Sequence, residues 1–434
     1  MPSPKCHRTP ITAAAASLIG STIEWYDFYI YATAVALVFN RIFFPSYNPT
    51  IGTLLAFGTY AVGAIMRPLG GVFFGHYGDR IGRKTTLVWT LGTMGSATVL
   101  IGLLPTYARI GIAAPILLLL LRSLQGAAFG GEWAGAALVA VEHAPDRKTG
   151  IVGSSAQIGS PFGLLMSTGT FSLLNKLPKG DFVAWGWRLP FLASAILVIV
   201  GLVIRLKLAE SPVFAEVLEK KHVSRIPVVE VLHDHFPQVA LGCGIILCTV
   251  VGFHVESVFL VSYATQALGV PRQVVLNALL VTSILQVVLL PSFAMVGDRL
   301  GIRKVALAGA VMTGICAFPF FWLVDSGTPS GITCGMCLGL IGIAAMFSVL
   351  PPLLSSLFCP RLRYSGMSLC FGIAAGVVGG MSPLLSGALY VWAKAAWPIA
   401  LLVVLASLIS AMSIVLISSS GNIRRPERAV APVG

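Results

Sequence analysis

Charged residues are scarce in this sequence. Only 10% of its 434 residues are Asp, Glu, Lys or Arg, whereas 56% are hydrophobic and the mean hydropathy is +0.88. A soluble protein of this length rarely has so little polar surface, and repeated runs of 18 or more apolar residues are typical of membrane-spanning helices. The composition therefore predicts an all-α membrane protein that crosses the bilayer many times.

Acidic residues are especially few, because 16 acids stand against 29 Lys and Arg and leave a net charge of +13. In a soluble protein this excess would suggest a nucleic-acid partner. In a membrane protein Lys and Arg concentrate in the cytoplasmic loops and set the orientation. We therefore expect the lipid bilayer, and no nucleic acid, as a partner.

The sequence also lacks the common signatures of catalysis and ATP binding. It contains no H-E-x-x-H or G-x-S-x-G pattern, and the turn Gly78–Thr85 does not have the spacing of a phosphate-binding loop. The pair Cys334-x-x-Cys337 has metal-ligand spacing, but no second pair or His cluster accompanies it. These absences predict no enzyme activity, no cofactor and no metal, and they leave an ion gradient or the substrate's own gradient as the driving force.

The hydropathy pattern predicts twelve spans. They divide the chain into a first bundle at 1–207, a cytoplasmic linker at 208–236 and a second bundle with a basic tail at 237–434. With both termini in the cytoplasm, 20 basic residues fall on the inside and seven on the outside, which supports this topology over its inverse. The predicted spans are 11–40, 51–75, 85–104, 112–141, 150–174, 187–206, 238–265, 273–296, 304–324, 331–357, 364–392 and 397–418.

The first span carries two acids, Glu24 and Asp27. It is too long and too charged for a cleavable signal. A carboxylate at mid-membrane costs several kcal/mol unless it faces a wet cavity or a cation. The acids are three residues apart and share one helical face, while Arg67 and Arg122 in two other spans are candidate partners. This pattern predicts a polar seam inside the bundle.

The two halves of the chain echo each other. The turn G-D-R-I-G-R-K at 78–84 returns as G-D-R-L-G-I-R-K at 297–304, and P-D-R-K-T-G at 145–150 is echoed by P-R-L-R-Y-S-G at 360–366. Two matching six-helix halves with a site between them near mid-membrane are the layout of many secondary transporters.

These motifs resemble those of a known family. The turn at 75–84 is similar to the loop signature of the major facilitator superfamily. The motifs Glu24-Trp25-Tyr26-Asp27-Phe28, Arg122-x-x-Gln125-Gly126 and Gly130-Gly131-Glu132-Trp133 resemble its metabolite–proton symporter branch. The resemblance implies twelve transmembrane helices in two pseudo-symmetric six-helix bundles and a place in a bacterial inner membrane.

The repeated turns suggest a conformational latch at the cytoplasmic ends of the helices. Asp79 is expected to accept from backbone N–H groups at the next helix start, and Arg80 and Arg83 to bridge to acids or helix C-termini on neighbouring helices. The alternative is simple anchoring by positive charge. The predicted latch residues are Gly75, Asp79, Arg80, Arg83, Asp298 and Arg299.

Span four carries a polar stripe of Arg122, Gln125, Phe129 and Glu132, spaced along one helical face. Facing a central cavity, Arg122 is predicted to pair with a first-span carboxylate, and protonation of Asp27 would break that pair. The alternative is a static buried ion pair that fixes helix packing. The predicted proton-coupling residues are Asp27, preferred over the neighbouring acid, and Glu24, Arg122 and Glu132.

Candidate substrate contacts lie in both halves. An Arg at position 67 suits a carboxylate, although a tie to Glu132 or Asp27 is the alternative. His254 and Glu256 are the second half's only deep ionisable residues, and they do not share a helical face. The predicted substrate-binding residues are Arg67, Tyr26, Gln125, Gln157, His254 and Glu256.

Together these features predict a secondary transporter, not an enzyme, that takes up a small organic acid or zwitterion with protons by alternating access. The alternatives are an exporter, antiporter or uniporter of the same fold, and a membrane sensor without transport. We expect a small metabolite and protons as partners, and a monomer in the membrane.

Overall fold

The computed structural model describes residues 9–45, 49–145, 147–174, 176–219 and 224–419. The predicted basic tail and several basic residues of the predicted inside segments lie outside the described residues: Lys5, Arg8, Lys220, Lys221, Arg424, Arg425 and Arg428.

Six helical units form the first half, at the positions that hydropathy predicts. They are α1 (Thr9–Ala34) with the π-helical segment η1 (Val35–Phe39), α3 (Pro49–Gly78), α4 (Arg83–Leu103), α6 (Ala113–Glu142), α7 (Thr149–Gly153) with α8 (Ser155–Leu174), and α10 (Leu189–Leu206). Short helices lie between them: α2 (Asn40–Phe43), α5 (Tyr107–Ile110), α9 (Lys179–Ala184) and η2 (Gly186–Arg188).

Six further units form the second half. They are α13 (Phe236–His254) continued by η3 (Val255–Phe259), α14 (Leu260–Ser262) and η4 (Tyr263–Ala267), then α15 (Arg272–Leu300), α16 (Ile302–Val324), α17 (Pro329–Ser355), α18 (Arg363–Phe371) with η5 (Gly372–Gly379) and α19 (Gly380–Ala393), and α20 (Trp397–Ser419). Among the described residues nine helices are long and apolar enough to cross a membrane, and the units at α1, α3 and α8 complete the twelve.

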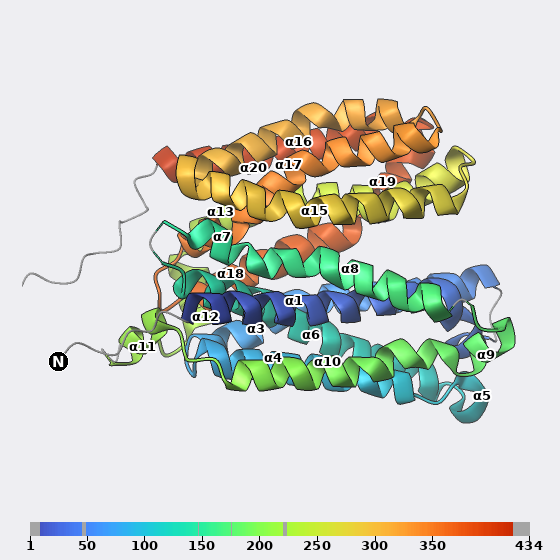
Figure 1. Cartoon of the computed structure of the whole chain (residues 1–434), viewed down its shortest axis with the longest axis horizontal. Coiled ribbons are helices and arrows are strands. Elements are labelled where there is room, and N and C mark those ends of the chain that lie inside the picture. Colours follow the sequence, from blue (N-terminus) through green and yellow to red (C-terminus); the bar gives the residue numbers. More distant parts are fainter. Residues whose placement is uncertain (1–8, 46–48, 146, 175, 220–223, 420–434) are drawn as a thin grey trace, which may run out of the picture.

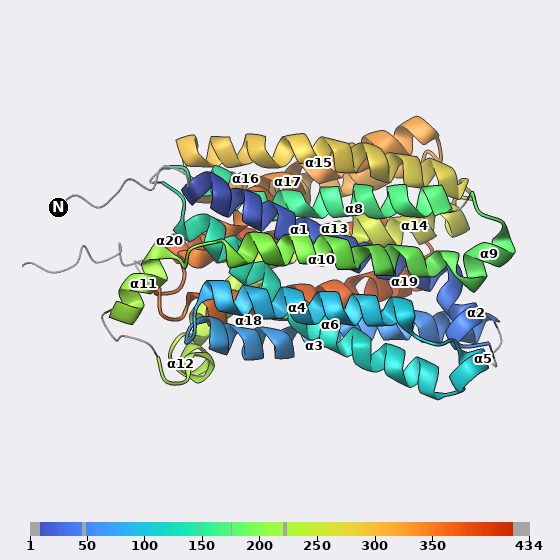
Figure 2. The same cartoon turned by 60° about the horizontal axis from the view of Figure 1, so that its bottom comes forward.

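The halves lie side by side along the length of the molecule. Figure 1 shows the second half above the first, with α8 and α15 adjacent at their boundary. The helix α1 begins and α20 ends at the same end of the bundle, which we call the terminal end. The linker helices α11 (Pro212–Glu219) and α12 (Pro227–Asp234) also lie there (Figure 2).

The sequence repeat is visible in the backbone. Gly82 before α4 has φ +113°, and Gly301 before α16 has φ +108°. These are equivalent positions of the two repeated turns, and such φ values favour glycine. The repeat therefore places the same sharp bend at the same point of each half.

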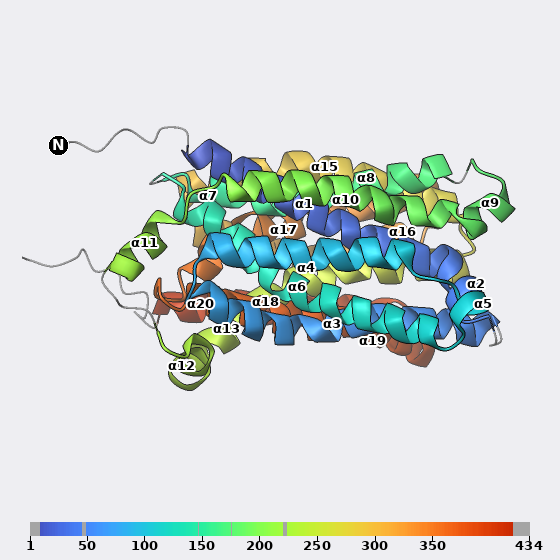
Figure 3. The ribbon, with the colours of Figure 1, turned by 90° about the horizontal axis from the view of Figure 1, so that it is seen from below.

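Glycines bring α3 and α6 into close contact, and the two helices run side by side in Figure 3. A Cβ on Gly126 would collide with the backbone of Gly63, and one on Gly130 would collide with the Arg67 carbonyl. Close approach through small residues is a common way to associate helices in a membrane. The packing fixes Arg67 of α3 beside the polar stripe of α6.

Candidate functional site

Two aspartates join the halves at the terminal end. Asp79, at the end of α3, accepts hydrogen bonds from the backbone N–H groups of Tyr364 (3.2 Å) and Ser365 (2.8 Å) in α18. Asp298 of α15 accepts from Gly150 (2.7 Å) and Ile151 (2.9 Å) in α7. A carboxylate at a helix N-terminus satisfies free N–H groups and the helix dipole.

The two sequence echoes therefore contact each other across the halves. The aspartate of each Gly-Asp-Arg turn caps a helix of the opposite half. The capped helix begins in the second echo, at 360–366 for Asp79 and at 145–150 for Asp298. The contact is possible because Gly75 is small, since a Cβ there would lie 2.9 Å from Ser365 Cα. We call this pair of contacts the cross-cap.

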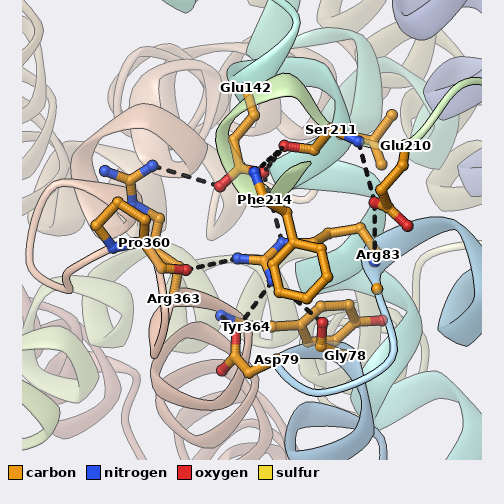
Figure 4. A network of polar contacts seen from close by, with 12 residues as sticks. Gly78, Asp79, Arg83, Glu142, Glu210, Ser211, Phe214, Pro360, Arg363 and Tyr364 are labelled. Carbon is orange, nitrogen blue, oxygen red and sulfur yellow. Dashed lines mark hydrogen bonds and ion pairs between the residues drawn. The ribbon is translucent and has the colours of Figure 1, made fainter. Parts of the chain in front are cut away.

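Arg83 is the centre of a buried network around Asp79, one of the two aspartates of the cross-cap (Figure 4). Its guanidinium lies 3.2 Å from Asp79 Oδ1 and 3.5 Å from Glu142 Oε2, and it donates to the Pro360 carbonyl of the second half at 2.7 Å. The ring of Phe214 in α11 stacks on the guanidinium, 4.2 Å away. The network thus joins both halves and the linker.

The predicted latch needs two corrections. Asp79 does not cap the next helix, α4. Glu210 of the linker caps it instead, because its Oε1 accepts a hydrogen bond from the backbone N–H of Arg83 at 3.0 Å. Arg80 and Arg299 are exposed and take no part in the network. The sequence missed Glu210 because it lies far along the chain from the turn it caps.

Asp79 lies outside the membrane-spanning helices, and burial raises its pKa to about 6. The charge of Arg83 and the N–H groups of Ser365 and Tyr364 oppose this rise. A buried acid with partial compensation titrates closer to neutrality than one in water.

A small cavity inside the first half is lined by the arginines that the sequence singled out. Its walls include Arg67 of α3, Arg122 and Gln125 of α6, and the rings of Phe28 and Phe129. The Arg67 guanidinium lies 4.1 Å from the Phe129 ring centre, and the Arg122 guanidinium lies 4.1 Å from the Tyr31 ring centre. Arginines on aromatic faces keep donors free for an anion.

Arg122 reaches Asp27 through two intermediates. Its Nη1 donates to Gln125 Oε1 (3.1 Å), Gln125 Nε2 donates to Thr98 Oγ1 (2.7 Å), and Thr98 Oγ1 donates to Asp27 Oδ2 (2.8 Å). Ser194 of α10 donates to the other carboxylate oxygen of Asp27 at 2.6 Å. The predicted direct pair is therefore replaced by a chain, which we call the relay. The sequence missed Thr98 and Ser194 because hydroxyl groups carry no strong signal in apolar spans.

Glu132 has a different partner from those predicted. It forms a buried ion pair with Arg205 of α10 and accepts from Thr90 of α4. Arg205 lies in the last turn of α10, but its side chain is buried in the bundle and also donates to the Leu87 carbonyl. Arg67 is consequently not tied to Glu132.

Glu24 is fully buried one turn from Asp27 on α1. Neither of its carboxylate oxygens has a hydrogen-bond partner among the described residues. The Arg205 guanidinium packs against Gly20, one turn earlier on α1. Glu24 therefore lies close to the Glu132–Arg205 pair without sharing it.

Two predicted substrate contacts are engaged in packing. Tyr26 is buried in the core of the first half, where its hydroxyl donates to the Pro190 carbonyl at 3.2 Å. Gln157 accepts from Trp133 Nε1 (2.8 Å) and donates to the Phe347 carbonyl of the second half (3.1 Å). Gln157 thus bridges the halves, with its amide groups already occupied.

Two aromatic pairs meet across the boundary between the halves. Trp133 of α6 and Phe371 of α18 stack with ring centres 3.9 Å apart, and Trp25 of α1 meets Phe253 of α13 edge to face at 6.2 Å.

His254 and Glu256 face different surroundings, as predicted. His254 packs against Gly379 of η5, since a Cβ there would lie 2.9 Å from its ring, and its Nδ1 lies 2.8 Å from the Val250 carbonyl. Glu256 lines a separate cavity within the second half.

The chain is similar in sequence to known membrane transport proteins. Residues 17–358 match the sequence profile of the Major Facilitator Superfamily. The chain is 40% identical over 416 residues to the "Shikimate transporter" of Escherichia coli (strain K12), covering 94% of each chain. It is 42% identical over 388 residues to the "Inner membrane metabolite transport protein YhjE" of the same strain, covering 87% of this chain and 88% of that one.

A more distant relative is the "Proline/betaine transporter" of Escherichia coli (strain K12), 31% identical over 389 residues, with 87% of this chain and 77% of that one covered. Among solved structures, the proton:xylose symporter XylE bound to 6-bromo-6-deoxy-D-glucose matches with a TM-score of 0.73 at 14% identity, covering 94% of this chain and 95% of that one. This likeness confirms the predicted fold of twelve helices in two halves. The chain belongs to the major facilitator superfamily and is a multi-pass membrane transporter, not an enzyme.

Proposed function

We propose that this transporter takes up a small carboxylate-bearing metabolite together with protons. Rocking of the two halves opens the cavity near Phe28, in the first half, to one side of the membrane at a time, and the terminal end faces the cytoplasm. The observation that carries the proposal is the relay from Arg122, in the cavity wall, to Asp27 behind it.

The cavity wall favours an anion. Arg67 and Arg122 are both buried and line the same cavity, and neither forms an ion pair with an acid among the described residues. Two uncompensated guanidinium groups are costly away from water unless an anion joins them. A carboxylate matches the fork of donors that each guanidinium presents. The nearby rings of Phe28 and Phe129 offer an apolar surface for the substrate's carbon skeleton.

The relay connects the residue that would bind the substrate, Arg122, to the residue that would bind the proton, Asp27. A carboxylate that takes Arg122 Nη1 withdraws it from Gln125, and the amide of Gln125 is then free to turn away from Thr98. Thr98 is a weaker donor to Asp27 once it no longer accepts from Gln125, and its hydroxyl can turn to the Met94 carbonyl (3.0 Å), which favours the neutral form of Asp27. Binding of the anion and protonation of Asp27 thus support each other, as coupled transport requires.

The cross-cap defines the conformational step. Access from the terminal end requires Asp79 to leave Tyr364 and Ser365, and Asp298 to leave Gly150. Rocking of the halves about a fixed site is the usual mechanism in this architecture.

Uptake into proteoliposomes with imposed pH and voltage gradients tests the proposal, with shikimate, 2-oxoglutarate, proline and betaine as probes. We expect accumulation that a protonophore abolishes. Each charge moved gains about 2.3 kcal/mol per 100 mV. Accumulation that survives the protonophore would point to another coupling ion or a uniporter, outward pumping to an exporter, and binding without flux to a sensor.

Asp27→Asn separates coupling from binding. This variant is expected to lose accumulation against a gradient while it keeps exchange of labelled for unlabelled substrate. Full accumulation by Asp27→Asn would remove Asp27 from the mechanism. Tyr26→Phe, one residue away and facing the core, is the control and is expected to accumulate substrate normally.

A further inference from the structure

A second cavity is lined entirely by residues of the second half of the transporter. Its walls come from α13 and η3, α16, α17 and α20, and they include Glu256, Thr313, Cys316, Phe320 and Gly339. None of its lining residues belongs to the first half. The cavity is therefore distinct from the one lined by Arg67 and Arg122.

Glu256 is the acid of this cavity. Glu256 is only 7% exposed, and its carboxyl group forms no hydrogen bond or ion pair with any described residue. Its Oε2 lies 3.8 Å from the place where a Cβ on Gly339 would be, so a glycine on α17 leaves room for the carboxyl group. Glu256 also lies in the π-helical segment η3, and such segments occur often at functional sites.

The surroundings do not neutralise a negative charge. Of the described side chains lining the cavity, none is basic. Thr313 already donates its hydroxyl to the Gly309 carbonyl at 2.9 Å. The other titratable groups nearby are thiols, Cys316 on α16 and Cys337 on α17, while α20 contributes Val403. His254, the last residue of α13, packs against Gly379 instead.

We propose that this cavity is a second proton-binding site, with Glu256 as the proton acceptor. A carboxylate without a cation in such surroundings is costly, whereas the neutral acid is tolerated. A metal ion does not fit, because the wall side chains offer only the Glu256 and Thr313 oxygens and hard cations need six or more. The step adds one proton to one carboxylate oxygen and forms one O–H bond. It needs no other reactant.

The location assigns the proton a role apart from substrate recognition. Glu256 faces the interior of the second half, whereas Phe253, three residues earlier, meets Trp25 of the first half. A neutral Glu256 allows the second half to tilt without moving an uncompensated charge through the membrane field. The site thus makes movement of this half dependent on proton supply.

Infrared titration of the purified full-length protein in lipid vesicles tests the site directly. The background carries Glu24→Gln and Asp27→Asn, which silence the two acids of α1, and the spectrum of the same background with Glu256→Gln is subtracted, so that Asp79, Glu132 and the other acids cancel. We expect the difference to show a band of a protonated carboxyl group that grows as the pH is lowered, because the Glu256→Gln protein lacks this part of the signal. Cys316→Ser, in the same wall, is the matched control and is expected to keep the band.

An unchanged band in the Glu256→Gln protein, or no protonated band at any pH, would overturn the proposal. If the background protein does not fold, the same comparison is made between the single Glu256→Gln variant and the unmodified chain. A thermal melt of each variant shows whether it is folded.

A binding measurement separates the site from the proposed substrate cavity, and this arm rests on the proposed function. The probe is a carboxylate that the unmodified protein binds, chosen from shikimate, 2-oxoglutarate and benzoate. We expect Glu256→Gln to keep its affinity within about twofold. A loss as large as that of Arg67→Gln would place Glu256 in the substrate site and overturn the proposal. Unchanged binding by Arg67→Gln would contradict the proposed function alone.

Discussion

Asp79 of the first half and Ser365 of the second half are joined by a 2.8 Å hydrogen bond, in which the backbone N–H of Ser365 donates to the Asp79 carboxylate. The equivalent bond from Gly150 to Asp298 runs in the opposite direction between the halves. One repeated turn therefore serves twice, and the closed terminal end is held by two related contacts.

Asp79→Asn is expected to open the terminal end. The amide keeps one acceptor oxygen but turns an NH2 group toward the second backbone N–H, whereas a protonated Asp79 keeps two oxygens as acceptors. A buried donor left without a partner costs about 1–3 kcal/mol, which corresponds to a shift of about fivefold or more toward the open form. Spin-label distances between the terminal ends of α3 and α18 measure the shift.

Asp298→Asn is expected to act in the same way on distances between α15 and α7. Arg80→Gln, in the same turn as Asp79 but exposed, is the control and is expected to leave the distances unchanged. Equal distances in Asp79→Asn and the unmodified protein would show that the cross-cap does not hold the ends together.

The closed terminal end is expected to depend on pH. Asp79 has a pKa of about 6 when the end is closed, and a value near 3.9 is expected when water reaches it. The closed form therefore binds the proton more tightly, so the closed form is favoured as the pH falls and loses that advantage as the pH rises through 6. Between pH 7 and pH 5 linkage gives a shift of about tenfold.

The same spin-label distances, recorded from pH 7 to pH 5, check this dependence. Asp79→Asn has no titrating group at this position and is expected to lose the pH response. A shift toward the open form at low pH would contradict the sign derived for Asp79.

Thr98→Val tests the relay without changing side-chain volume much. Valine accepts nothing from Gln125 and donates nothing to Asp27, so the connection between Arg122 and the acid is cut. We expect substrate affinity to remain within a few-fold, while accumulation driven by a pH gradient falls by about tenfold or more, as for a lost bond to a charged group.

Thr86→Val, on the same helix, is the matched control, because the Thr86 hydroxyl donates to the Gly82 carbonyl and not to an acid among the described residues. Proton-driven accumulation by Thr98→Val at the unmodified level would show that coupling does not pass through this hydroxyl.

Arg67→Lys tests carboxylate recognition. Lysine keeps the charge but lacks the planar fork that stacks on Phe129. We expect KM to rise about tenfold with Lys and further with Gln. For the amide of the same substrate, which has no carboxylate, we expect KM to differ little between these variants. Equal losses for the acid and its amide would indicate a structural role for Arg67.

The Glu132–Arg205 pair is expected to stabilise the first half only as a pair. Removing one partner from a buried ion pair costs about 3–5 kcal/mol, whereas replacing both with apolar groups is often neutral. Glu132→Leu and Arg205→Met should each lower the melting temperature, and the double variant should recover most of it. A double variant that melts as low as the sum of both losses would contradict this interpretation.

The sequence by itself determined the class and the plan of the protein. Twelve apolar runs can only be helices in lipid, because every backbone polar group must be satisfied within the segment. The repeated Gly-Asp-Arg turns announced two matching halves, and their glycines, Gly82 and Gly301, have the positive φ that the bend requires. The charged residues of the first span and of α6 were correctly identified as buried, since acids so deep need protein surroundings.

Only the tertiary structure decided which buried charge meets which partner. Arg122 and Arg205 lie on different helices at different depths, and their reach depends on helix rotation and side-chain direction, which hydropathy does not encode. Thus Glu132 pairs with Arg205, and Asp27 accepts from Thr98 and Ser194. Asp79 caps a helix almost 300 residues away in the sequence. Short-range periodicity fixes a helix face, whereas the partner of that face is set by packing between segments distant in the chain.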